Sequence, residues 1–558
     1  KRVDYSGRGV IVVDPELEID QVRIASKELL RNLLEMKGTD SDLDLNNKEI
    51  LEEIRKRPLI LNRQPSLHRL SIQAFENVPL EANEEKVIYL NPLVTGGFGA
   101  DFDGDTMAFH IPVSEEAVKE TENLLPSNNI LSPASEQIHF NLGQDIKLGN
   151  YFCKNDREFL KELSPYKTLE EFISKINNKD SLIKLKNVVN IILNKATMSG
   201  TTFSVFDLIV KDNKEILEGY KNKKIKENEL DFFKENNTLV SIYLANVKKY
   251  RENLFQMCYE KGTVSGIREK KFKERDPEIK SCYLQGLTCG EYYYATYGAR
   301  FALVSKKLGT GKGGDLTRHL IEAVYDITIT KEDCRTKKGI TLPLDKNLKG
   351  RYRAYDSKLL DENLIDSMTD KNIIIRSPVT CECNDGICGK CYGNFIGQIA
   401  EPGLPVGIIA AQSIGERGTQ LQMKIIHQAG KEDIKTAIGQ DLEVALNLFM
   451  APSEKVEEIL GKPVSIEGLM ELAKSIYPQG SILDRHFEVI FRYMLKNCPE
   501  GRRRSLKDII NDSDFMKKST FSSTLKSLAE KASGNNITDI KGYKKKLLVT
   551  SFIESKVK

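Results

Sequence analysis

The feature that constrains this chain most is a run of three aspartates at alternate positions, in the stretch Asp-Phe-Asp-Gly-Asp at residues 101–105. Side chains alternate along an extended segment, so Asp101, Asp103 and Asp105 are predicted to point to the same side. Gly104 allows a tight turn before the last of them. Three neighbouring carboxylates repel one another unless a cation binds them, and converging oxygen ligands suit Mg²⁺. The motif therefore predicts a magnesium site.

A calcium-binding loop is the first alternative, and the sequence excludes it. An EF-hand loop requires Gly at its sixth position and Glu at its twelfth. Counted from Asp101, these positions hold Thr106 and Pro112. A solvated acidic turn without a metal remains the second alternative.

The cysteines suggest a second metal. The chain has 558 residues and ten cysteines, of which four lie between Cys381 and Cys391. In a long chain without a secretion signal, such clustering favours metal binding over disulfides and indicates a cytoplasmic protein. Cys334 lies upstream of a Cys-x6-Cys-x2-Cys series, and four thiolates form a closed, structural zinc site. Spacing alone leaves Cys383 open as a ligand, and a group of reduced, buried cysteines is the alternative.

Composition sets broader limits. At roughly 150 residues per domain, the length predicts three or four domains. A hydrophobic fraction of 40% and a charged fraction of 29% are typical of a globular protein and exclude general disorder. The net charge of +3 implies that any surface for nucleic acid is local. No apolar run approaches the roughly 20 residues that span a bilayer, so no membrane association is expected.

Local patterns predict several elements. Residues 8–13 and 87–94 are predicted strands because β-branched residues are bounded there by Gly, Asp and Pro. Spaced apolar residues predict helices over 19–36 and 46–57. A further helix is predicted over 114–125, opened by Ser114 and followed by Pro126. The Lys-, Glu- and Asn-rich stretch 211–237 is interpreted as solvated surface.

A second motif precedes the aspartates. Residues 61–69 read Leu-Asn-Arg-Gln-Pro-Ser-Leu-His-Arg. Together with residues 101–105, they closely resemble the active-site region of the largest subunit of multisubunit RNA polymerases. In that family both segments belong to one double-psi β-barrel. The resemblance implies such a barrel over residues 1–112, with Arg63 contacting the ribose of the incoming nucleotide.

The resemblance continues in order along the chain. Residues 127–149 resemble the segment after the barrel, 286–326 the bridge helix, 405–430 the trigger loop with its supporting helix, and 479–543 the C-terminal part of a bacterial β′ subunit. The implied fold class is α+β and multidomain. Its parts are the barrel (1–112), a helical pore or funnel region (113–279), the bridge helix (280–330), a zinc-binding module (331–400), the trigger loop with its helices (401–450) and a C-terminal jaw or clamp-base region (451–558).

The bridge segment contains a conflict. Apolar residues at helical spacing, Phe301, Val304 and Leu308, then Leu316 and Leu320, could each line a helix face. Four glycines lie between the two groups, at positions 309, 311, 313 and 314, and each costs about 1 kcal/mol inside a helix. On these grounds a loop between two helices is expected. The family instead has a helix that bends during translocation, and the resemblance places Thr310 and Gly311 at the substrate.

The trigger segment places Gln420, Met423, Lys424 and His427 on one helix face. Taken alone, such a face is more typical of a core. The resemblance implies that this helix closes over the nucleotide, with Met423 on the base, Gln420 near the sugar, and Lys424 and His427 as catalytic residues near the triphosphate. Bacterial β′ usually has Arg at the position of Lys424, so the charge is kept but the two-pronged phosphate contact is lost. Arg417 is a second departure from the family, which usually has Pro at this position.

The resemblance also selects among the cysteines. The second zinc site of bacterial β′ corresponds to Cys334, Cys381, Cys388 and Cys391, without Cys383. Gly99 is a departure, because the family usually has Asn there and its amide contacts the ribose hydroxyls. The resemblance therefore implies weaker rejection of deoxynucleotides in this chain.

The expected function is that of the catalytic part of a bacterial-type DNA-dependent RNA polymerase β′ subunit. Asp101, Asp103 and Asp105 would hold the first of two Mg²⁺ ions, and the second would arrive with the nucleotide. Expected partners are template DNA, RNA, nucleoside triphosphates, a β subunit or its fragments and a sigma-like factor, with α and ω as further candidates. The alternative is a non-catalytic, polymerase-derived scaffold that binds nucleic acid.

The family has further modules before the segment that begins this chain. A separate polypeptide carrying the N-terminal part of β′ is therefore expected. The Lys- and Asn-rich composition without tryptophan favours a phage origin, in which case the protein would act in the host cytoplasm.

Overall fold

The computed structural model describes residues 5–24, 57–78, 87–140, 142–208, 238–245, 256–257, 260–264, 278–368, 371–427, 440–478, 480–499 and 501–511, with residues 247 and 529. The chain folds into two compact units. The first comprises the residues up to Ser132 together with Gln137–Gly298, and the second comprises Pro133–Glu136 and most residues from Ala299 onward. Within the described part, no helix combines the length and the apolar character needed to cross a membrane.

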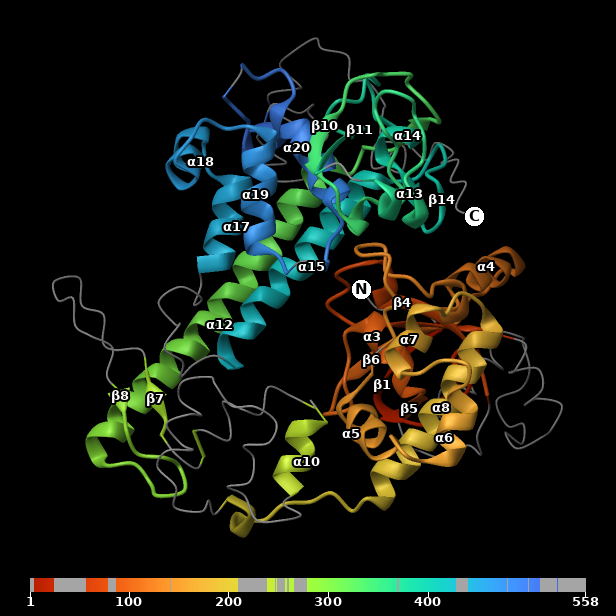
Figure 1. Ribbon diagram of the computed structural model, residues 1–558, viewed down its shortest axis with the longest axis vertical. Coiled ribbons are helices and arrows are strands. Elements are labelled where there is room, and N and C mark those ends of the chain that lie inside the picture. Colours follow the sequence, from red (N-terminus) through yellow and green to blue (C-terminus); the bar gives the residue numbers. More distant parts are fainter. Residues whose placement is uncertain are drawn as a thin grey trace. The chain divides into compact units, whose positions relative to one another are not determined.

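A closed six-stranded barrel forms the centre of the first unit (Figure 1), with the strand order β1-β5-β2-β4-β3-β6. The strands are β1 (Ser6–Val13), β2 (Gln21–Ile24), β3 (Leu59–Asn62), β4 (Ile72–Asn77), β5 (Val87–Leu90) and β6 (Thr106–His110). β1 pairs in parallel with β5 and antiparallel with β6, which closes the barrel. Burial alternates along β3 and β5, so one face of each strand fills the interior.

The barrel corrects part of the sequence-based prediction. The strand at residues 8–13 is confirmed, whereas the one predicted over 87–94 ends at Leu90 and is followed by a 3-10 turn at Pro92–Val94. The helix predicted over 19–36 is wrong at Gln21–Ile24, where burial alternates with the period of a strand. Residues 25–36 of that helix, the helix predicted at 46–57 apart from its last residue, and the stretch 211–237 lie outside the described residues.

Helices extend the barrel core. Barrel residues share one hydrophobic cluster with residues of α5 to α8. As predicted, Ser114 opens a helix, its side chain accepting the Ala117 N–H at 3.1 Å, although the α-helical part ends at Glu120 and continues as a 3-10 turn. The other α-helices and strands in the described part of this unit are α3 (Thr95–Phe98), α4 (Glu115–Glu120), α5 (Gln144–Phe152), α6 (Arg157–Leu163), α7 (Leu169–Ser174), α8 (Lys179–Met198), α10 (Thr238–Leu244), β7 (Gly262–Thr263) and β8 (Glu278–Ile279).

In its described residues, the second unit is mainly helical, with three small two-stranded sheets. Most of its helices share one hydrophobic core with the cysteine-rich segment. The helices are α12 (Cys289–Val324), which begins before this unit, α13 (Glu362–Ser367), α14 (Gly389–Tyr392), α15 (Val406–His427), α17 (Gln440–Met450), α18 (Ser453–Leu460), α19 (Ile466–Ile476), α20 (Asp484–Leu495) and α21 (Leu506–Asn511). The strands are β9 (Ile329–Lys331), β10 (Ile340–Pro343), β11 (Asn372–Ile375), β12 (Ile387–Cys388), β13 (Asn394–Phe395) and β14 (Gln398–Ile399).

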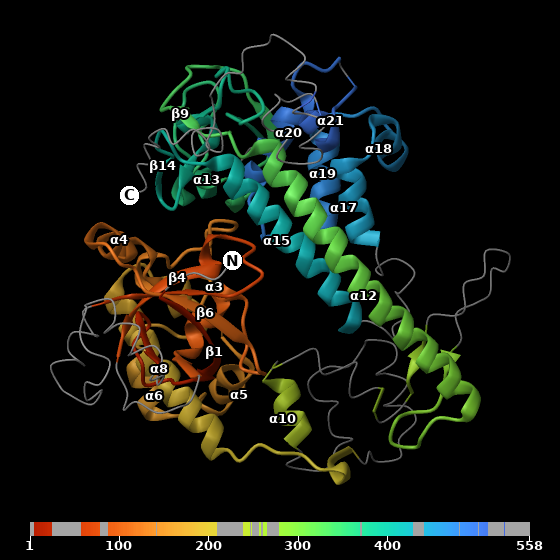
Figure 2. The ribbon, with the colours of Figure 1, turned by 180° about the vertical axis from the view of Figure 1, so that it is seen from behind.

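α12 is one continuous helix of 36 residues, so the loop expected from its glycines is wrong. Figures 1 and 2 both show its C-terminal half beside α15. Leu316 and Leu320 are fully buried, as their spacing predicted. Val304 and Leu308 are instead more than half exposed, at 57% and 65%. Packing of the C-terminal half thus supplies the stability that the glycines remove locally.

Candidate metal centres

The aspartate motif lies in the loop that joins α3 to β6. Gly99 ends α3 in a left-handed conformation, with φ 60° and ψ 34°. Residues 102–104 then form a turn, which corrects the extended conformation expected for the motif. The backbone oxygen of Asp105 accepts the Ile11 N–H at 3.0 Å, so β1 holds the end of the loop in place.

The turn nevertheless brings the three carboxylates together. One oxygen each of Asp101, Asp103 and Asp105 lies within 4.8 Å of the others. Asp101 and Asp103 are exposed and Asp105 is half-buried. The predicted convergence of these side chains is therefore confirmed, although it comes from a turn and not from the period of a strand.

Arg63 holds the third carboxylate. Its Nε donates to Oδ2 of Asp105 at 3.0 Å, and the Asp101 N–H donates to the same oxygen at 3.2 Å. Arg63 itself follows β3, where its backbone N–H donates to the Ser71 oxygen at 3.1 Å. Two donors on one oxygen fix the orientation of Asp105. Contact between Arg63 and a ribose stays a prediction.

The electrostatics of the cluster favour a cation. The hydrogen bond with Asp103, partial burial, and the negative charges of Asp103 and Asp105 raise the pKa of Asp101 above its usual value. The two neighbouring carboxylates thus oppose the ionisation of Asp101, and a divalent ion would offset that repulsion. Hard oxygen donors with open, solvated positions fit Mg²⁺, which keeps several waters and binds substrate phosphates.

The other predicted substrate residues belong to the second unit. Thr310 and Gly311 are exposed on α12, where the Thr310 hydroxyl donates to the Lys307 oxygen at 3.0 Å. Gln420, Met423, Lys424 and His427 lie in the last turns of α15, so the predicted helix is present. Their side chains lie outside the described part of the chain, and their roles stay predictions.

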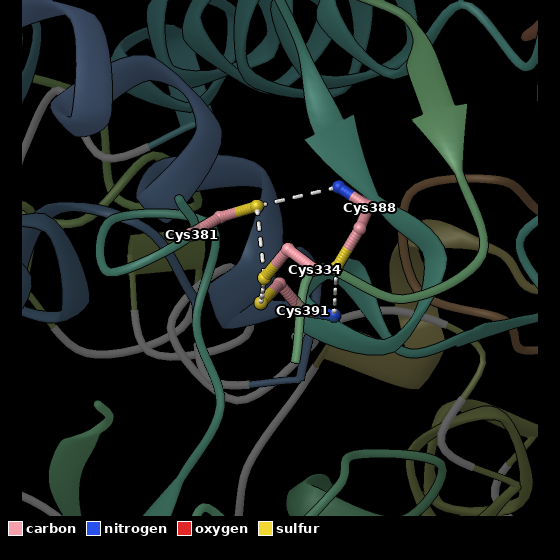
Figure 3. Close-up of side chains that lie close together, drawn as sticks. All are labelled: Cys334, Cys381, Cys388 and Cys391. Atoms are coloured by element: carbon pink, nitrogen blue, oxygen red, sulfur yellow. Dashed lines mark hydrogen bonds between the residues drawn. The ribbon is translucent and has the colours of Figure 1, made fainter. Parts of the chain in front are cut away.

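The four cysteines selected by resemblance form a second cluster (Figure 3). Cys334 follows β9, Cys381 lies in a loop, Cys388 ends β12 and Cys391 belongs to α14, and the four side chains converge. The Sγ atoms of all four lie within 4.8 Å of one another. Sγ of Cys334 is 3.6 Å from that of Cys391 and 3.8 Å from that of Cys381.

These distances fit zinc. A tetrahedral site with Zn–S bonds of about 2.3 Å separates its sulfurs by about 3.8 Å. Backbone N–H groups already donate to two of the sulfurs, Cys388 to Cys381 and Cys391 to Cys388, both at 3.4 Å. Cys383 is buried but does not belong to the group, which closes the alternative that spacing left open.

The thiols also need a cation in order to ionise together. The hydrogen bond with Cys388 and that with Cys391 lower the pKa of the Cys381 thiol. The hydrogen bond with Cys381 in turn raises the pKa of Cys388 to about 12, and Cys381 likewise raises that of Cys391. One thiolate therefore hinders the next, and a bound divalent cation would remove this obstacle.

Sequence reasoning missed the charged residues around the cysteines. Arg376 is completely buried against the thiols and pairs with Asp333, which also pairs with Lys390. Arg492 of α20 donates to the backbone oxygens of Pro378, Cys381 and Cys383. The position of Asp333 next to Cys334 in the sequence was the one local signal. Arg376 and Arg492 are separated from Cys334 and Cys381, respectively, by many residues, so no short sequence pattern links the members of either pair.

Two family models and a set of named proteins are similar to this chain. Residues 23–126 match the family described as RNA polymerase Rpb1, domain 2, and residues 286–444 match RNA polymerase Rpb1, domain 5. Proteins named DNA-directed RNA polymerase subunit beta' are similar over 77% of this chain. That from a Nitratiruptor species is 30% identical over 574 residues, and that from Aquifex aeolicus is 32% identical over 583 residues.

Over the matched residues, the sequence is similar to β′ subunits. The first match ends beyond the aspartate loop, so it includes the barrel strands from β3 onward and the candidate magnesium ligands. The second match includes α12, all four cysteines and α15. The chain spans less than two fifths of these relatives, 38% of the Nitratiruptor protein and 37% of the Aquifex protein.

Proposed function

We propose that this β′-type chain is the catalytic part of a multisubunit DNA-dependent RNA polymerase. The observation that carries the proposal is the convergence of Asp101, Asp103 and Asp105 within 4.8 Å at the end of a closed barrel. The barrel is proposed to be the double-psi barrel of that family. A non-catalytic scaffold is less well supported, because a binding surface for nucleic acid does not require three converging carboxylates.

In this proposal, Asp101, Asp103 and Asp105 hold Mg²⁺. A bound magnesium ion would supply positive charge that favours the RNA 3′ oxygen as a nucleophile, and a second would accompany the nucleotide. Arg63 contributes by keeping Asp105 in the orientation described above. The exposed position of Asp101 and Asp103 leaves room for substrate to approach.

Residues of α12 and α15 are proposed to contact the incoming nucleotide. Met423 would contact the base, Gln420 and Arg63 the sugar, and Thr310 and Gly311 the nucleotide from α12. Lys424 and His427 would supply positive charge or a proton near the leaving pyrophosphate. These assignments rest on the resemblance of the motifs, and the helical spacing of the residues in α15 is compatible with them.

The cysteines are proposed to hold one structural zinc ion. Four thiolates form a closed site without an open coordination position. The working assembly is proposed to contain template DNA, RNA, nucleoside triphosphates, a β-type subunit and a specificity factor of the sigma kind.

The test uses the purified complex that contains the full chain, assayed for Mg²⁺-dependent extension of an RNA primer on a DNA template. Asp103→Asn should lower the extension rate by roughly two to three orders of magnitude or more, since one charge-stabilising group is lost. Asp180→Asn is the control, because Asp180 is an exposed aspartate in the first turn of α8. Unchanged extension by Asp103→Asn, or nucleic-acid binding without any extension by the unsubstituted complex, would overturn the proposal.

A further inference from the structure

Arg376 is the most deeply buried charged side chain beside the cysteine cluster. It follows β11 and has no exposed surface. Its Nη2 lies 3.3 Å from Sγ of Cys334, 3.5 Å from that of Cys391 and 3.6 Å from that of Cys388. One guanidinium nitrogen therefore faces three of the four candidate zinc ligands, at distances typical of N–H···S hydrogen bonds.

The guanidinium is held there from several sides. Nη2 also donates to Oδ1 of Asp333 at 2.7 Å, and Nη1 donates to the Ser357 hydroxyl at 3.2 Å. The other carboxylate oxygen of Asp333 pairs with Lys390 Nζ at 3.0 Å. The backbone N–H of Arg376 donates to the Tyr352 oxygen at 2.8 Å. Because both ends of the residue are fixed, its position beside the sulfurs is set by the fold.

The positive charge of Arg376 would offset the negative charge of a zinc–thiolate centre. Zinc with four thiolates carries a net charge of about −2, which is unfavourable in a buried site unless a cation lies close by. Arg376 cannot lose its proton under ordinary conditions, so it supplies a permanent positive charge. Donors to a metal-bound sulfur also withdraw electron density from it, and such outer partners commonly change metal affinity about 10- to 100-fold.

We propose that Arg376 is the outer-sphere partner of the zinc thiolates, retaining the metal and lowering the reactivity of the sulfurs. This inference rests on the proposed zinc site and assigns Arg376 a role beyond packing. Asp333 acts through Arg376 by orienting it, and Lys390 balances the second oxygen of Asp333. Arg376 is thus a positioning residue that does not itself bind the ion.

A matched control lies beside the same cysteines. Arg492 is also buried, at 8% exposure, and its guanidinium binds the loop that carries Cys381. All of its described contacts with that loop are to backbone oxygens of Pro378, Cys381 and Cys383, and none is to a ligand sulfur. Replacement of Arg492 therefore tests loss of a buried arginine without loss of an N–H···S contact.

The experiment compares Arg376→Met, Arg376→Lys and Arg492→Met in the full, zinc-loaded chain. Zinc release to an excess of a chromogenic chelator should be at least about tenfold faster in Arg376→Met than in the unsubstituted chain. The release rate of Arg376→Lys should be intermediate, and that of Arg492→Met should be lower than the rates of both Arg376 variants. In the Co²⁺-substituted chain, the sulfur-to-cobalt charge-transfer band should move to lower energy in Arg376→Met and stay in place in Arg492→Met. A structural role alone would leave this band unchanged.

If Arg376→Met does not fold, Asp333→Asn serves as the second variant, because it keeps the side-chain volume and removes the charge that orients Arg376. Asp333→Asn should also accelerate zinc release, by a smaller factor than Arg376→Met. Equal release rates and equal spectra for the Arg376 and Arg492 variants would overturn the inference while leaving the zinc site intact. Absence of zinc from the folded, unsubstituted chain would instead contradict the zinc proposal itself.

Discussion

At the scale of single residues, Gly99 shows how one position links conformation to chemistry. It ends α3 with a positive φ of 60°, and a Cβ added there would meet nothing within 4 Å. Asn tolerates this left-handed conformation better than most residues. The fold therefore has space for the Asn that the polymerase family usually carries at this position.

We predict that Gly99→Asn sharpens discrimination between GTP and dGTP by about five- to tenfold, the effect of roughly 1 kcal/mol from one hydrogen bond to the ribose. The measurement is the ratio of kcat/KM for the two nucleotides in the assembled complex. Gly461→Asn is the control, because Gly461 ends α18 with a φ of 65° and equally open space. An unchanged ratio with full activity would show that Gly99 has no bearing on sugar choice.

At the scale of elements, the contact between α12 and α15 depends on small residues. A Cβ on Gly407 would lie 1.9 Å from the Val324 backbone oxygen, and one on Gly415 would lie 2.5 Å from the Thr317 hydroxyl. Neither the backbone of α12 nor the buried Thr317 can move without separating the helices. The same face of α15 tolerates more at Gly418, where an added Cβ would be 3.8 Å from its nearest neighbours.

Gly407→Ala should therefore lower the free energy of unfolding of the second unit by about 1–3 kcal/mol through overpacking. Gly418→Ala should be neutral or should stabilise α15 by up to about 1 kcal/mol, because alanine favours a helix over glycine. Urea unfolding of both variants, with hydrogen exchange of the α12 amides, provides the check. Equal stability of the two variants would mean that the helices separate at little cost.

At the scale of the whole molecule, α20 connects segments that lie far apart in the sequence. Arg485 bonds Glu136 and the Asn394 oxygen, and Glu488 forms a fully buried pair with Arg351 at 2.7–2.9 Å. His486 contacts the Pro133 oxygen at 3.0 Å. This helix thereby joins residues 133–136, the cysteine module and the helical core of the second unit.

His486 makes the stability of this unit depend on pH. Burial, with the nearby charge of Arg485, lowers the pKa of His486 to about 3. Between that value and about 6.5, the unfolded chain binds a proton that the folded chain excludes, so stability falls as the pH falls below about 6.5. The free energy of unfolding should drop by about 1 kcal/mol between pH 7.5 and 5.5 on account of His486.

His486→Gln should remove this part of the pH dependence, because glutamine can still donate to the Pro133 oxygen and does not titrate. Urea midpoints at the two pH values, measured in zinc-containing buffer, give the comparison. His110→Gln, which alters a histidine of the barrel, should leave the pH dependence of the second unit unchanged. Identical pH dependence in His486→Gln and the unsubstituted chain would contradict the assignment.

Local sequence was sufficient where the chemistry depends on neighbours. The aspartates of residues 101–105 and the cysteines near 388 lie close in the chain, so their convergence could be predicted, as could the Ser114 cap. It failed where packing outweighs local preference. At β2 the local apolar pattern predicts a helix, and the segment is a strand because it pairs with barrel strands that lie far away in the sequence. α12 stays helical through its glycines because α15 supports its C-terminal half.

By itself, the sequence indicated the aspartates and the clustered cysteines as candidate metal ligands, since ligand type and short spacing are local properties, whereas the set of four cysteines was implied by resemblance. Only the tertiary structure decided which groups surround the ligands. Arg63 meets Asp105 across 42 positions and Arg376 meets Cys334 across 42, with Arg492 reaching Cys381 across 111. Such contacts arise because a folded core brings distant segments together to bury apolar surface, and the polar groups carried along must then find partners.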